Sequence, residues 1–202
     1  MIKLSKFTNK RRRSIFLIGS IFLLLTILSK SNAQNTNSVP SQSQPGIFTV
    51  SVNGKPMLFN PSKLLAFRVK EDGSVSISAQ TSTDIFNTNI LVMNIAPSDT
   101  TKLITKGEYK IVPEDDASNF IVRAEYSSNA NGNSSYWWSD ASRVKGGQII
   151  IDLITTDRIK GRFSFTGVLE KEDGSMDAKN LVKITNGIFD LPLETRSRID
   201  PR

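Results

Sequence analysis

Three adjacent aromatic residues are the side chains in this sequence best suited to hold a ligand. Tyr136, Trp137 and Trp138 lie in the stretch SNANGNSSYWWSDAS, residues 128–142, whose other members are mostly Ser, Asn, Gly and Asp. Tyr and Trp rings combine flat apolar faces with a polar edge, which suits them to stack on a sugar ring or to contact another protein. We therefore take these three residues as the candidate ligand-binding site.

The positions of the three aromatic residues limit how they act together. If residues 135–139 are extended, successive side chains point to opposite faces of a sheet, so Tyr136 and Trp138 share one face and Trp137 takes the other. If the stretch is a binding platform, Trp137→Ala should leave the fold intact. The alternative is that Tyr136 and Trp138 pack into the core, while Trp137 lies across a neighbouring strand or the Gly-rich loop.

Two missing residue types exclude most catalytic mechanisms. The chain contains no His and no Cys, which rules out Ser-His-Asp and Cys-His nucleophiles, histidine acid/base chemistry and ordinary zinc or copper sites. Carboxylates, Lys, Tyr and hydroxyl groups are the reactive side chains that remain. We expect a protein that binds rather than catalyses, with no cofactor and no metal site.

Acidic residues supply the alternatives to this expectation. A glycosidase needs two carboxyl groups held roughly 5 to 10 Å apart, and Asp152 interrupts the apolar run QIIIDLIT, although alternation also allows it to face solvent. The pentapeptide KEDGS occurs at 70–74 and again at 171–175, and PEDDAS occupies 113–118. Calcium loops space their carboxylates at alternate positions, whereas here the acids are adjacent. We therefore predict hairpin turns for both KEDGS copies and a solvated turn for PEDDAS.

Most of the chain beyond residue 46 alternates between apolar and polar residues. The segments 48–52, 65–69, 75–79 and 120–126 place apolar side chains at every second position, which is the period of a strand with one buried face. Turn residues separate these segments, and Asn186-Gly187 joins or kinks a last strand pair. About ten short strands with hairpin connections and no amphipathic helix indicate an all-β domain, an antiparallel sandwich or barrel.

The first 33 residues have the pattern of a secretory signal peptide. Basic residues up to Arg13 precede the apolar block SIFLIGSIFLLLTIL, and Ala33 offers a small residue for cleavage. This block is shorter than the roughly 20 apolar residues of a membrane helix, although an uncleaved anchor is the alternative. No Cys follows the block, so we do not expect a lipoprotein.

The other boundaries follow from composition. The Gln/Asn/Ser/Pro-rich residues 34–45 are predicted to be a flexible linker, residues 46–194 a single β domain, and residues 195–202 a polar tail. Seven of the 26 Lys and Arg residues and none of the 19 acids fall within residues 1–33. The remaining chain is therefore neutral, and we expect neither nucleic acid as a partner nor stable membrane insertion after cleavage.

Several short motifs resemble a family of secreted Bacteroidetes proteins that is known as a domain of unknown function. The chain shares with it FTVSVNGKPM near the start of the domain, GEYKI in the middle, and GGQIIIDL, GRFSFTG and VKITNGIFDL towards the end. The resemblance covers most of residues 47–193. It departs at Met57, where members carry an aromatic residue after the NGK turn. The resemblance implies an exported, β-rich single domain, and it supplies no functional residues.

We accordingly expect an exported β domain in the periplasm, at the cell surface or outside the cell. Its expected role is to bind a glycan or an envelope protein through Tyr136, Trp137 and Trp138. Two other functions remain open: a carboxylate-based hydrolase, and a structural protein that assembles by pairing its sheet edges.

Overall fold

The computed structural model describes residues 46–113, 116, 118–140 and 142–198, which all belong to one compact unit. Over these residues the chain forms twelve strands and one short 3-10 turn, η1 (Pro61–Lys63), with no α-helix. The strands are β1 (Ile47–Val52), β2 (Lys55–Met57), β3 (Leu64–Val69), β4 (Val75–Gln80), β5 (Thr88–Pro97), β6 (Gly107–Ile111), β7 (Phe120–Ala130), β8 (Asn133–Ser139), β9 (Gly147–Ile154), β10 (Arg158–Glu170), β11 (Met176–Pro192) and β12 (Glu194–Arg196). The expected signal peptide and linker lie outside the described residues.

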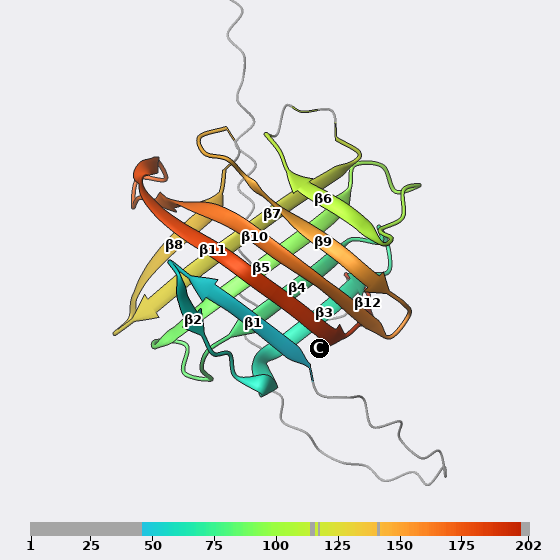
Figure 1. Cartoon of the computed structure of the whole chain (residues 1–202), viewed down its shortest axis with the longest axis horizontal. Coiled ribbons are helices and arrows are strands. Elements are labelled where there is room, and N and C mark those ends of the chain that lie inside the picture. Colours follow the sequence, from blue (N-terminus) through green and yellow to red (C-terminus); the bar gives the residue numbers. More distant parts are fainter. Residues whose placement is uncertain (1–45, 114–115, 117, 141, 199–202) are drawn as a thin grey trace, which may run out of the picture. The chain divides into compact units, whose positions relative to one another are not determined.

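The strands form two layers that share a corner. One layer has the order β12-β3-β4-β5-β7-β8, and the other has the order β6-β9-β10-β11-β1-β2. In Figure 1, β9, β10, β11 and β1 lie across β3, β4, β5 and β7, so the strand directions of the two layers cross. The long strand β10 joins the layers because its first part pairs with β9 and its last part, from Gly167 to Glu170, pairs with β8.

The all-β prediction is confirmed, and of its two versions the structure is the sandwich. The path of hydrogen-bonded strands ends at β12 on one side and at β2 on the other, so the sheet does not close into a barrel. All strand pairs are antiparallel except β12 with β3. Consecutive strands mostly pair as hairpins, as the turn residues predict.

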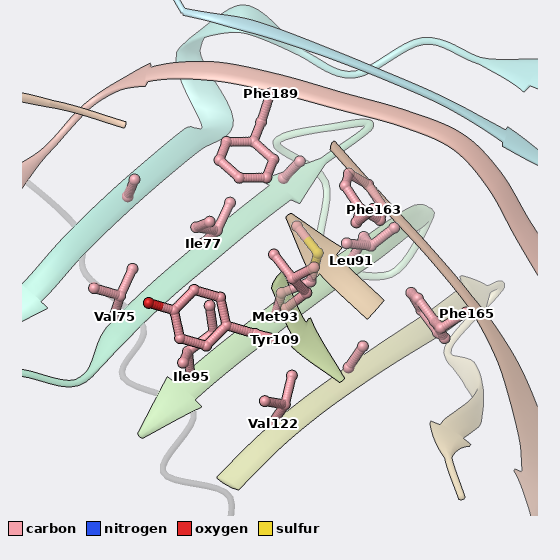
Figure 2. Packing of buried hydrophobic residues seen from close by; sticks show 14 of the residues in the cluster. Val75, Ile77, Leu91, Met93, Ile95, Tyr109, Val122, Phe163, Phe165 and Phe189 are labelled. Carbon is pink, nitrogen blue, oxygen red and sulfur yellow. The ribbon is translucent and has the colours of Figure 1, made fainter. Parts of the chain in front are cut away.

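The core lies between the two layers and follows the period-two alternation. Val75 and Ile77 on β4 and Leu91 and Met93 on β5 are at most 1% exposed. Figure 2 shows these side chains meeting Phe163, Phe165 and Phe189 from the opposite layer. Burying such side chains contributes roughly 1.5 to 3 kcal/mol each before the entropy of ordering is counted.

Two irregularities alter the expected alternation. The segments on either side of Asn186-Gly187 belong to one continuous strand, β11, in which Asn186 has a positive φ of 53°. In β9, Asp152 is an extra residue, because Gly161 pairs with Ile151 while Lys160 pairs with Leu153. This bulge reverses the parity that follows it, so Leu153 is 40% exposed rather than buried.

The C-terminal boundary of the domain lies beyond the predicted residue 194. Residues 194–196 form β12, and Ser197 and Arg198 contact the β3–β4 turn, where the Arg198 backbone N–H donates to Glu71 Oε2 at 2.9 Å. Residues 195–198 are thus part of the folded domain rather than of a polar tail.

The strands at the ends of the layers are short or interrupted. β12 and β2 have three residues each, and β2 contains Pro56, which cannot donate to a further strand. β6 carries Glu108 and Lys110 at its edge. Short, charged and Pro-containing edges discourage edge pairing. No helix among the described residues has the length and apolarity needed to span a membrane.

Candidate functional site

The three aromatic residues of the sequence motif lie on β8, on two different faces. Pairing of β7 with β8 sets Tyr136 opposite Ser127, Trp137 opposite Tyr126 and Trp138 opposite Glu125. Since Tyr126 points into the core, Trp137 does so too, while Tyr136 and Trp138 share the outer face. The predicted division of the three residues is therefore present.

The two sequence interpretations differ from the structure in which aromatic side chains of β8 point to the core. Trp137 packs against the core, with its ring centroid 5.6 Å from that of Tyr126, and its Nε1–H donates to Asn180 Oδ1 at 3.4 Å. This packing disfavours the expectation that Trp137→Ala leaves the fold intact, and the shared outer face of Tyr136 and Trp138 disfavours the alternative that these two residues pack inward. The register of the β7–β8 hairpin decides this.

Trp138 is held in place by a carboxylate from the neighbouring strand. Its Nε1–H donates to Glu170 Oε2 at 2.7 Å, and Val168, its direct partner on β10, is completely buried. A charge-assisted hydrogen bond fixes the orientation of the indole more firmly than a neutral bond would. The hydrogen bond to Glu170 thus sets the orientation of this half-buried ring.

Glu125 lies on the other side of Trp138. Burial of its carboxyl group, assisted by the negative charge of Glu170, raises the pKa of Glu125 to about 7. The side chains of Glu125, Trp138 and Glu170 form a row across β7, β8 and β10. In this row, the carboxyl group of Glu125 holds a proton at mildly acidic pH. Alternation within β7 places Glu125 on the outer face, but only the register of the hairpin brings it to Trp138.

A groove of about 700 Å³ opens beside this row. The β7–β8 ladder ends at Glu125 and Trp138, because the Ala124 N–H donates to the Ser139 hydroxyl oxygen at 2.8 Å and the chain then leaves the sheet. Among the described strands, none pairs with the first residues of β7 on that side, and the space between them and the end of β8 becomes the groove. Its walls combine apolar residues such as Phe120, Ile121, Trp138 and Met176 with the acids Asp140 and Glu170.

The loop after β8 builds one polar wall of the groove. The carboxylate of Asp140 accepts hydrogen bonds from the Ser142 N–H at 3.0 Å and from the Ser142 hydroxyl at 2.5 Å, and it pairs with Arg143 Nε at 2.8 Å. Asp116 and Arg123 also line the groove. Rigid acceptors beside an apolar ring suit a ligand that carries hydroxyl or amide donors.

Among the described acids that sequence reasoning singled out, Asp116 lines the groove and the others do not. Asp152 is exposed on the outer face of the β9–β10 hairpin, with its Oδ1 3.5 Å from Arg162 Nη2. Both KEDGS segments are hairpin turns, as predicted, and each has a single positive φ, at Gly73 and at Gly174. Glu114 and Asp115 of PEDDAS lie outside the described residues. Among the residues that are described, no three acidic side chains converge as a metal site.

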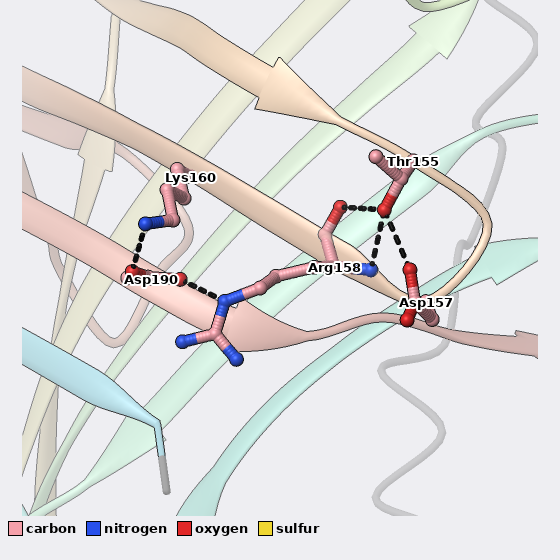
Figure 3. Close-up of polar contacts among 5 residues, drawn as sticks. All are labelled: Thr155, Asp157, Arg158, Lys160 and Asp190. Atoms are coloured by element: carbon pink, nitrogen blue, oxygen red, sulfur yellow. Dashed lines mark hydrogen bonds and ion pairs between the residues drawn. The ribbon is translucent and has the colours of Figure 1, made fainter. Parts of the chain in front are cut away.

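Another carboxylate of the domain, Asp190, forms ion pairs that join two strands. Asp190 on β11 lies between Arg158 Nε at 2.5 Å and Lys160 Nζ at 2.7 Å, both on β10 (Figure 3). Partial burial acts to raise the pKa of Asp190, but hydrogen bonds from Arg158 and Lys160 outweigh it and lower the pKa. This group fastens β10 to β11, and it does not line the groove beside Trp138.

Comparison with known proteins identifies a family. A family model described as a domain of unknown function, DUF6252, matches residues 47–191. No curated protein and no solved structure matches the chain.

Proposed function

The chain belongs to the DUF6252 family, and from the geometry of its groove we propose that it is a non-catalytic domain that binds a glycan. The observation that carries this proposal is the indole of Trp138, which a hydrogen bond to Glu170 holds at the wall of a groove of about 700 Å³. Pockets for small ligands typically have volumes of roughly 300 to 1,000 Å³, with few polar groups among apolar ones.

The lining residues favour a glycan over a protein as the ligand. The face of a sugar ring stacks on an indole, and its hydroxyl groups donate to carboxylates such as Asp140 and Glu170. Ile121, which is 50% exposed at the wall of the groove, extends the apolar surface beyond Trp138. A groove of this size accommodates a few sugar units, whereas each partner in a standard protein interface buries about 800 Å².

Affinity electrophoresis tests this proposal. The protein is run in native gels that contain dextran, xylan, laminarin or soluble starch, beside gels without polysaccharide. We expect at least one polysaccharide to retard the wild type and to retard Trp138→Ala much less. Phe86→Ala is the control, since it removes an exposed aromatic ring that does not line the groove, and it should be retarded like the wild type. Equal retardation of all three proteins, or of none, would contradict the proposal.

A second candidate function rests on the two glutamates. Glycoside hydrolases use an acid with a raised pKa and a second carboxyl group, and Glu125, with a pKa of about 7, has Glu170 as a neighbouring acid. Glu170 lines the groove and would contact a substrate, while Glu125 lies behind Trp138. Release of reducing sugar from the same four polysaccharides, abolished in Glu170→Gln, would support hydrolysis. No release by the wild type would contradict hydrolysis.

We also propose that residues 1–33 direct export. The basic start, the apolar block and Ala33 support this. Mass spectrometry of the protein recovered from its native cells should find a chain that begins at Gln34. A chain that retains residues 1–33 would contradict cleavage.

A further inference from the structure

Three exposed apolar residues lie at one end of the domain, away from the Trp138 groove. Leu58, in the segment after β2, is 87% exposed, and Ile85 and Phe86, in the β4–β5 loop, are 47% and 61% exposed. Figure 1 shows the β2–η1 segment, the β4–β5 loop and the β7–β8 turn at the same end of the strands. We call these three side chains the apolar end.

The loop that carries Ile85 and Phe86 is held by hydrogen bonds of its own. Asp84 Oδ1 accepts the Phe86 N–H at 2.9 Å, Asp84 Oδ2 accepts from the Asn87 amide at 2.9 Å, and the Asp84 N–H donates to Ser82 Oγ at 3.0 Å. These bonds close the loop on itself. Ile85 and Phe86 stay exposed although the loop is ordered.

The neighbouring segments fasten this loop from both sides. Asn129 Nδ2 donates to the Ile85 carbonyl at 3.0 Å, and the Asn131 N–H donates to Asn87 Oδ1 at 3.1 Å. On the other side, the Asn60 N–H donates to the Gln80 carbonyl at 2.8 Å, which ties the segment of Leu58 to the end of β4. A fixed arrangement of exposed apolar side chains loses little entropy when it binds.

The size and charge of this end indicate its partner. Three side chains cannot fill the roughly 800 Å² that each partner in a standard protein interface buries. A lipid layer, in contrast, admits single apolar side chains without a matching surface. Segments 58–60, 81–87 and 129–133 contain no Lys or Arg, and Asp84 is their one charged residue. This composition favours a zwitterionic lipid surface over an anionic one.

We propose that the apolar end contacts the surface of a lipid bilayer, with Leu58, Ile85 and Phe86 reaching the boundary between headgroups and acyl chains. The surrounding Asn, Ser and Thr side chains then face the headgroups, with which they form hydrogen bonds. This contact is separate from the glycan groove, so either proposal stands if the other fails.

A local fluorescent probe tests this contact in the full chain. Because the sequence has no Cys, Thr83→Cys provides a single labelling site in the β4–β5 loop, and Thr100→Cys provides a matched exposed site in another loop. Each is labelled with the environment-sensitive dye NBD and mixed with phosphatidylcholine vesicles. A probe at residue 83 reports on this end of the domain even where residues 1–33 bind the vesicle.

We expect a blue shift and quenching by lipid-attached spin labels at residue 83, and neither at residue 100. Adding Leu58→Ser and Phe86→Ser to Thr83→Cys should lower the apparent vesicle affinity of that probe roughly tenfold or more. No shift at residue 83, equal shifts at both sites, or a shift unaffected by the two Ser substitutions would overturn the proposal. A shift with phosphatidylglycerol vesicles alone would also overturn it, because it would indicate attraction by charge.

Discussion

At the scale of single residues, the two adjacent tryptophans lie in different environments. Trp137 packs on Tyr126 and the core, whereas Trp138 lies on the outer face with its Nε1–H on Glu170. Adjacent residues on a strand must diverge in this way. The sequence predicts the divergence, but which ring faces inward depends on the partner strand.

Substituting the two tryptophans should separate stability from binding. Because Trp137 is partly buried in the core, we expect Trp137→Ala to lower the free energy of unfolding by roughly 2 to 3 kcal/mol. Trp138→Ala should cost at least about 1 kcal/mol less, since Glu170 can then be hydrated. Urea unfolding followed by circular dichroism measures both. A larger loss for Trp138→Ala would contradict this assignment of the two faces.

Glu125 makes the stability of the domain depend on pH. Its pKa in the fold is about 7, against an ordinary value of 4.5 for a glutamate, so the folded protein binds more protons than the unfolded chain between these values. The stabilising effect of protonation is fully present below pH 4.5 and is lost as pH rises through 7. At 1.36 kcal/mol per pKa unit, the loss amounts to at most about 3 kcal/mol.

Neutralising Glu125 should remove this dependence. In Glu125→Gln, we expect the urea midpoint to change much less between pH 4.5 and 7 than it does in the wild type. Glu172→Gln, which alters an exposed acid in a turn, is the control and should keep the wild-type profile. Identical profiles for Glu125→Gln and the wild type would show that Glu125 titrates normally.

At the scale of elements, turns determine which side chains meet. Asn131 and Gly132 both have positive φ, of 52° and 81°, as a two-residue hairpin turn of type I′ requires. This turn pairs Ala130 with Asn133, and counting back along the ladder brings Glu125 opposite Trp138. The Asn-Gly pair was therefore the signal from which this half of the site could have been predicted.

The other half of the site could not be found in this way. Glu170 reaches Trp138 because β10 pairs with β8 through its last residues, and the β10–β11 register shifts between Val168 and Leu169. Bulges such as this one, and the extra Asp152 in β9, leave no clear mark in an alternating sequence. The positions of most strands and turns could be predicted from the sequence, whereas the pairing of strands that are far apart in the sequence could not.

A glycine on β10 tests how tightly the elements pack. A Cβ atom on Gly161 would lie 2.2 Å from the Ile150 carbonyl oxygen and 2.5 Å from the Phe189 ring, whereas one on Gly107 of β6 would meet nothing within 4 Å. We expect Gly161→Ala to destabilise the domain by roughly 1 to 3 kcal/mol. Gly107→Ala should be neutral or slightly stabilising. Thermal unfolding measures both, and equal melting temperatures would contradict the close approach.

At the scale of the whole molecule, the corner between the two layers creates the candidate site. β10 pairs with strands of both layers, and the groove opens where β8 ends beside the first residues of β7. A closed barrel would have no such gap. Composition excluded histidine and cysteine chemistry, but the groove itself follows from the fold and is not evident in the sequence.

The central claim is that Trp138 contacts a glycan, and fluorescence of a single tryptophan tests it most directly. Trp137→Phe leaves Trp138 as the one tryptophan of the chain, and Trp138→Phe leaves Trp137. Each variant is titrated with cello-, xylo-, malto- and chito-oligosaccharides. The account predicts a saturable change in emission with at least one series in Trp137→Phe and none in Trp138→Phe. A change confined to Trp138→Phe, or no change with any series, would contradict it.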